Sequence, residues 1–233
     1  MESRFRDLVV DSIFPRFCAS CHKEGSLWCA TCRDHWSFRP QAPACGFCHQ
    51  QGSSVTCVAC RAETSLDGLI AFGPYANPVL RNMLRSWKYV GDRSADAVLQ
   101  HWLFREADRL QPPMLPFFIT PIPLHIKRER VRGFDQAHIL ATWIEQMYGL
   151  PILPLLKRSV QTHAQAQIRG RDRKLGELDD IFFIDPHLRD ELPEHVLLCD
   201  DVFTSGATMD AAAQVLKQSG VKTVWGFVIA KGH

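Results

Sequence analysis

The stretch that decides the fold is Val196-Leu197-Leu198-Cys199-Asp200-Asp201-Val202-Phe203-Thr204-Ser205-Gly206-Ala207-Thr208. An apolar run ends in two adjacent acids, and a short Thr/Ser/Gly loop separates it from a helical pattern over residues 209–218. In open α/β sheets, ligand sites gather at the carboxyl ends of the strands. The free N–H groups at the start of the following helix then offer a phosphate site. The neighbouring carboxylates suit a ribose diol or a hydrated Mg²⁺.

This stretch resembles the phosphoribosyl-pyrophosphate (PRPP) motif of type I phosphoribosyltransferases. The resemblance implies that Asp200 and Asp201 are the catalytic acids, which hold the ribose hydroxyls directly or through Mg²⁺. It assigns the PRPP phosphate to the loop that follows: Thr204, Ser205, Gly206, Ala207 and Thr208. The alternative interpretation is a plain strand–turn–helix in which Ser205 or Thr208 only caps the helix. The chain contains neither a Walker-type loop nor a dinucleotide fingerprint.

The composition of the chain narrows the class of protein. Its 233 residues are 46% hydrophobic and 22% charged, which suits one α/β domain with a small appendage. The net charge of +2 is too small to indicate a partner. No apolar run approaches the roughly 20 residues of a membrane span, and charged residues interrupt the N-terminal segment, unlike a secretory signal. We therefore expect a cytoplasmic protein without membrane insertion, with a short helix at its N-terminus.

Eight of the nine cysteines form four Cys-x-x-Cys units: Cys18/Cys21, Cys29/Cys32, Cys45/Cys48 and Cys57/Cys60. Two such units complete a tetrahedral zinc site, so four units predict two sites, both structural because four thiolates leave no open position. A disulfide framework does not suit a chain without a secretory signal, and a thioredoxin-like pair needs only one unit. Sequential pairing of the units is the simplest, and a crossed pairing stays open. Cys199 is expected to be a buried apolar residue.

Strand and helix patterns alternate after the cysteine segment. Besides the decisive stretch, strands are predicted at residues 67–75, 117–120, 180–184 and 222–230. Helices are predicted at 94–110, at 134–148 and from residue 78 to an end near residues 88–92, where Gly91 would be the C-cap. Such alternation predicts a mainly parallel sheet covered on both faces. The expected fold is therefore α/β, with a sheet of the type I phosphoribosyltransferase type after a small double zinc ribbon. The expected domains are residues 1–65 and 66–233.

Basic residues are concentrated between residues 127 and 174, where ten Lys/Arg accompany four acids. A solvated charged face is the ordinary explanation of such a run. Its first cluster, however, follows a predicted strand end, where cations could stabilise a leaving pyrophosphate. Contact with pyrophosphate or with a DNA backbone is assigned to Lys127, Arg128, Arg130, Arg132, Lys88 and Arg173.

Several motifs in sequence order resemble the ComF family, also called GntX-like, of double-zinc-ribbon phosphoribosyltransferase-like proteins. They are the four cysteine units, the segments 84–89 and 121–125, Arg130-Val131-Arg132-Gly133-Phe134-Asp135-Gln136, and the Asp-Asp loop. The resemblance covers nearly the whole chain. It implies a flexible loop at 161–174, although His163 and Ala164 stand where the family usually has a proline.

Two functions follow from this resemblance. One is the handling of single-stranded DNA in the cytoplasm during natural transformation, with a retained PRPP site and with the DNA-uptake and recombination machinery as partners. Trp87, Tyr89 and Phe134 could stack on bases, although the helical spacing of Trp87 favours the core. The other is an active phosphoribosyltransferase that transfers ribose 5-phosphate from Mg²⁺-bound PRPP to an acceptor and releases pyrophosphate. No pattern indicates a nucleobase pocket.

Overall fold

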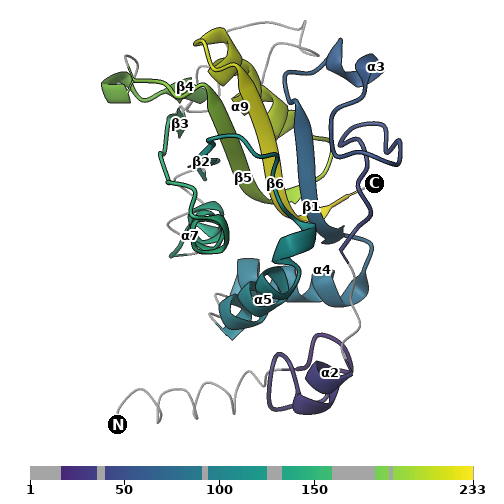
Figure 1. Cartoon of the computed structure of the whole chain (residues 1–233). Helices are drawn as coiled ribbons and strands as arrows, with labels where there is room; N and C mark the ends of the chain where they lie inside the picture. The colour runs from purple at the N-terminus through teal and green to yellow at the C-terminus, as the bar shows by residue number, and fades with distance from the viewer. Residues whose placement is uncertain are drawn as a thin grey trace, which may run out of the picture.

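The computed structural model describes residues 17–35, 40–90, 94–124, 133–158, 182–188 and 191–232. Within these ranges the main sheet has the strand order β1-β6-β5-β2 (Figure 1). Its strands are β1 (Gly68–Pro74), β2 (Phe118–Pro121), β5 (His195–Phe203) and β6 (Thr223–Lys231). All three neighbouring pairs run parallel. The predicted α/β class with a mainly parallel sheet is confirmed.

The helices follow the predicted order with shifted ends. They are α4 (Pro78–Arg85), α5 (Ser94–Arg105), α7 (Gln136–Tyr148) and α9 (Ala207–Gln218), with short 3₁₀ turns η2 (Ala107–Arg109) and η3 (Pro186–Leu188). The first of the expected helices, from residue 78 to near residues 88–92, changes form at its end, because α4 continues as a π-helical turn, η1 (Ser86–Val90). A small antiparallel pair, β3 (Leu156–Arg158) and β4 (Phe182–Ile184), lies outside the main sheet.

Alternate residues of strand β5 pack into two separate apolar cores, because successive side chains of a strand point to opposite faces of the sheet. Leu197 and Cys199 pack with residues of α4, α5 and α7. Val196 and Leu198 pack with α9 and with the β3–β4 pair. Both faces of the sheet are therefore covered, which explains why β5 reads as a continuous apolar run. Cys199 is fully buried, as predicted.

The cysteine segment consists of two similar units, residues 17–35 (the first cysteine unit) and 40–62 (the second cysteine unit). Each begins with a tight turn closed by a backbone bond, from Cys18 N to Lys23 O and from Cys45 N to Gln50 O, both 2.9 Å. A histidine with positive φ follows the second cysteine of each turn, His22 and His49. A short helix follows each third cysteine: α2 (Ala30–Asp34) and α3 (Val58–Arg61).

The two cysteine units attach to different parts of the sheet domain. The first unit packs on α4 and α5: the Asn82 side-chain amide donates to Ala19 O at 3.2 Å. The rings of Trp28 and Trp102 meet edge to face at 4.8 Å. The second unit joins the sheet itself, where Gln41 N donates to Phe72 O of β1 at 3.0 Å. Figure 1 shows α2 next to α4 and α5 at the bottom and α3 at the upper right.

Some predicted features lie outside the described residues. These are the short N-terminal helix, the basic cluster at 127–132 and the flexible loop at 161–174 with Arg173. In the part of the chain that the structure describes, no helix is long and apolar enough to cross a membrane.

Candidate functional site

Strand β5 delivers the two predicted acids to the carboxyl edge of the sheet on opposite faces. By the alternation along the strand, Asp201 follows Leu197 and Cys199 toward the α4 side, and Asp200 points toward the α9 side. Asp201 is only 7% exposed, and Asp200 is partly buried. The Asp201 backbone N–H donates to Asp200 Oδ1 at 2.7 Å, which fixes the Asp200 carboxylate beside its own strand.

Lys88 is brought to Asp201 by the π-helical turn η1. Its Nζ lies 2.8 Å from both carboxylate oxygens, and the two side chains are 18% and 10% exposed. The preceding residue, Trp87, is fully buried and stacks on Trp143 at 5.6 Å. Trp87 Nε1 also donates to Asp96 at 2.7 Å. The turn thus anchors one side chain in the core and directs the next to the site, and π-helical turns are frequent at functional sites. The preference for Trp87 as a core residue is confirmed.

Asp200 and Asp201 differ in their charge environment. Burial and the negative charge of Asp201 raise the pKa of Asp200 to about 7, and Asp135 at the start of α7 adds to this rise. The hydrogen bond from Asp201 N and the charge of Lys88 act in the opposite direction. The site therefore holds one carboxylate in an ion pair and one carboxyl group whose pKa is raised by burial and by its charged neighbour.

The start of α9 differs from the starts of α4 and α7. Asn77 caps α4 and Asp135 caps α7, each by accepting hydrogen bonds from two backbone N–H groups. The N-cap of α9 is Gly206, which has no side chain to offer. The three hydroxyl residues around it, Thr204, Ser205 and Thr208, are exposed. The Ala207 N–H donates to Ser205 Oγ at 3.4 Å. The start of α9 lines a pocket together with Asp200.

Gly206 is required by conformation and by space. Its φ of +83° lies in the left-handed region. A Cβ at this position would stand 2.5 Å from Phe203 Cζ and 2.8 Å from Phe47 Cε1. The loop over residues 204–208 (the 204–208 loop) therefore rests directly on two aromatic rings.

The eight cysteines form two clusters: Cys18, Cys21, Cys29 and Cys32, and Cys45, Cys48, Cys57 and Cys60. Within each cluster the four sulfurs lie within 4.8 Å of one another. The Sγ atoms of Cys21 and Cys29 are 3.6 Å apart and those of Cys48 and Cys57 3.5 Å apart. A tetrahedron with Zn–S bonds of ~2.3 Å has edges of about 3.8 Å. All eight thiols are free. The clusters therefore fit two zinc ions with four thiolates each. The first two Cys-x-x-Cys motifs form one cluster and the last two form the other, which is the sequential pairing.

The structure brings together part of the predicted site. Asp200, Asp201, Lys88 and the 204–208 loop meet at one edge of the sheet. Asp135 and Phe47 also belong to this region, and sequence reasoning did not assign them to it. Asp135 lies in the quoted Gly133–Gln136 motif, so its N-cap position offered a signal. No sequence signal indicated Phe47, because its contact with Phe203 joins distant segments and leaves no local pattern.

No family model matches the chain. The chain is 28% identical to competence protein F of Haemophilus influenzae over 222 residues, which cover 91% of this chain and 90% of that protein. It is 26% identical to the DNA utilization protein YhgH of Shigella flexneri, with 90% and 94% covered. It is 27% identical to competence protein ComFC of Bacillus subtilis, with 62% of this chain and 56% of that protein covered. These relatives confirm the resemblance inferred from the sequence.

Among solved structures, an adenine phosphoribosyltransferase from Leishmania tarentolae matches with a TM-score of 0.37 and 12% identity. That match covers 64% of this chain and 75% of the other.

Proposed function

We propose that this protein handles single-stranded DNA in the cytoplasm during natural transformation and keeps a PRPP-type phosphate site for that task. The relatives named for competence and DNA utilization support the process. The observation that carries the site is the start of α9, where a glycine N-cap and three exposed hydroxyl residues stand beside Asp200. DNA-uptake and recombination proteins would be the partners.

In this proposal the 204–208 loop binds the phosphate of the ligand and Asp200 binds its sugar or its Mg²⁺. Phosphate oxygens would accept hydrogen bonds from the N–H groups and hydroxyls of the 204–208 loop, where the helix dipole also favours an anion. Asp201 is engaged by Lys88. Asp200 faces the loop and would therefore contact the ribose hydroxyls or a Mg²⁺ that accompanies PRPP. A nucleotide unit of DNA also presents a phosphate next to a sugar, although as a singly charged diester on a deoxyribose. We therefore propose that both ligands use the phosphate contacts of this loop.

The test is fluorescence anisotropy of a labelled single-stranded oligonucleotide with zinc-loaded protein, with and without Mg-PRPP. We expect binding that PRPP displaces and that weakens steeply as salt rises. Ser205→Ala with Thr208→Val removes two hydroxyls from the loop and should weaken both ligands. Ser219→Ala changes an exposed hydroxyl at the other end of the same helix and serves as the control. Absence of DNA binding at low salt would reject the proposal.

The second candidate is an active phosphoribosyltransferase, which the gathering of Asp200, Asp201 and Lys88 beside the loop favours. In that reaction a nucleophile of the acceptor bonds to ribose C1 of PRPP while the bond from C1 to the pyrophosphate oxygen breaks. The side chains would position the sugar and balance the developing charge. Mg²⁺-dependent pyrophosphate release with a panel of nucleobases, lost in Asp200→Asn, would support this candidate. If no acceptor led to pyrophosphate release, this candidate would be rejected and the site would be one that only binds its ligand.

A further inference from the structure

The second cysteine unit touches the 204–208 loop directly. Phe47 lies between two cysteines of that unit, Cys45 and Cys48. Its ring meets the ring of Phe203 edge to face, with centroids 5.6 Å apart and planes at 74°. The two rings leave no room for a Cβ at Gly206. The position of the loop is therefore set by an aromatic side chain whose backbone belongs to a metal-binding turn.

The backbone of the same turn is tied to the end of the sheet. Lys231 is 3% exposed, and its Nζ donates to Cys45 O at 2.8 Å. The next residue, Gly232, donates its N–H to Phe203 O at 2.7 Å. Two consecutive residues at the end of β6 thus hold the cysteine turn on one side and the start of the loop on the other.

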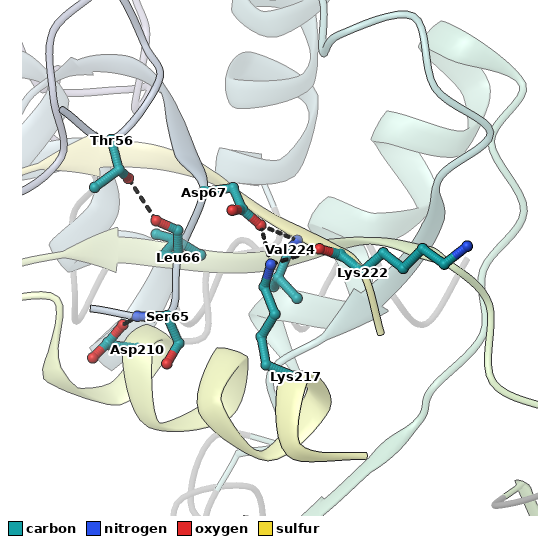
Figure 2. A network of polar contacts seen from close by, with 8 residues as sticks. All are labelled: Thr56, Ser65, Leu66, Asp67, Asp210, Lys217, Lys222 and Val224. Carbon is teal, nitrogen blue, oxygen red and sulfur yellow. Dashed lines mark hydrogen bonds and ion pairs between the residues drawn. The ribbon is translucent and has the colours of Figure 1, made fainter. Parts of the chain in front are cut away.

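A second set of contacts joins α9 to the segment that follows the second cysteine unit. Asp210, in the first turn of α9, accepts a hydrogen bond from Ser65 N at 2.7 Å. Near the end of α9, Lys217 pairs with Asp67 at 2.6 Å. Figure 2 shows these contacts on one side of α9, together with the hydrogen bond from Val224 N to Asp67. Both ends of α9 are thereby fixed to residues 65–67.

We propose that Phe47 is a positioning residue for the phosphate site, and that metal binding by the second cysteine cluster, but not by the first, is needed to hold the 204–208 loop in its binding form. The first cysteine unit makes its contacts with α4 and α5, through Ala19 and Trp28. The inference rests on the proposed function, because it assumes that the loop binds phosphate ligands.

The two clusters offer matched variants. Cys48 and Cys21 are both exposed and hold the same place in their units. Cys48→Ser is expected to weaken binding of Mg-PRPP, measured by titration calorimetry, by about tenfold or more, as when a hydrogen bond to a charged group is misaligned. Cys21→Ser is expected to stay within about twofold, since distant sites act independently. Equal losses in the two variants would overturn the proposal.

A variant at Phe47 tests the contact while both metal sites stay intact. Phe47→Ala should keep zinc at two ions per chain, as expected for two four-thiolate sites, yet weaken Mg-PRPP binding and speed amide hydrogen exchange over residues 203–209. Phe47→Leu keeps apolar bulk against Phe203 and should restore most of the affinity. Trp28→Ala, which removes the ring of the first unit, is the control. Unchanged affinity and exchange in Phe47→Ala would refute the positioning role.

These measurements separate the inference from the function on which it rests. If the wild-type protein binds no PRPP, the proposed function fails. Hydrogen exchange of residues 203–209 then still decides whether the second cluster holds the loop. If the wild type binds PRPP and Cys48→Ser and Phe47→Ala bind equally well, the inference alone fails.

Discussion

Replacing Asp200 by Asn is expected to stabilise the folded protein at pH 8, although it removes a group of the candidate site. Burial and the charge of Asp201 raise the pKa of Asp200 from 3.8 to about 7. Between those values the folded state holds a proton that the unfolded chain has lost, so stability falls as pH rises through this window and stays low above it. At about 1.4 kcal/mol per pKa unit, the full cost of ionisation approaches ~4 kcal/mol.

Asn keeps the acceptor Oδ1 that bonds the Asp201 N–H and carries no charge. We therefore expect Asp200→Asn to raise the free energy of unfolding at pH 8 by about 2–4 kcal/mol. The gain should be smaller at pH 6 by roughly 1 kcal/mol, because the pH then lies above the unfolded pKa by about two units rather than by the full difference between the two pKa values. Urea unfolding of zinc-loaded protein in Mg²⁺-free buffer at both pH values measures the difference.

Asp201→Asn is the matched control and should act in the opposite direction. It takes the charge from the partner of Lys88, whose side chain is 18% exposed, and leaves an unpaired cation. The expected loss is about 1–3 kcal/mol, less than for a fully buried pair, because the change also removes the charge that repels ionised Asp200. The reasoning is refuted if Asp200→Asn is less stable than the wild type at pH 8. It is refuted equally if the gap between them is the same at pH 6 and pH 8.

Three further predictions concern the supports of the site. Lys88→Met leaves the charge of Asp201 without its partner and should lower the free energy of unfolding by about 1–3 kcal/mol, seen in urea denaturation. Gly206→Ala must combine a left-handed φ with a displaced aromatic ring and should cost about 2–4 kcal/mol in thermal unfolding. Gly220→Ala has a positive φ but open space and should cost only about 1 kcal/mol. Chelation should release two zinc ions per chain, measured with a metal-sensitive dye, and unfold residues 17–62 first.

The features that could be predicted from the sequence are those that depend on residues a few positions apart. Cys-x-x-Cys fixes two sulfurs on one turn, so the two clusters follow from eight residues, and the structure settles their sequential pairing. The apolar run before Asp200 is long enough to cross the centre of a sheet, which placed both acids at its carboxyl edge. The expected helix over 94–110 was too long, because α5 ends at Arg105 and a 3₁₀ turn follows.

The features of the site that could not be predicted from the sequence depend on contacts between distant segments. No short sequence pattern predicted the π-helical turn that carries Lys88 to Asp201. In that turn Trp87 stacks on Trp143 of α7, a contact between distant segments. The contact of Phe47 with Phe203 joins residues more than a hundred positions apart. Such contacts are decided by packing, and packing is a property of the assembled fold.

Contacts between distant segments also connect the second cysteine unit to the proposed phosphate site. A loop that leaves its N–H groups open for a ligand forgoes the cap that would stabilise it. The helices α4 and α7 use a side chain at that position. The start of α9 is held instead by contacts with the second cysteine unit and the segment after it. Phe47 packs on Phe203, Lys231 binds Cys45 O, and Ser65 N donates to Asp210. In the proposal made above, four thiolates on one metal ion would hold the turn that carries Phe47.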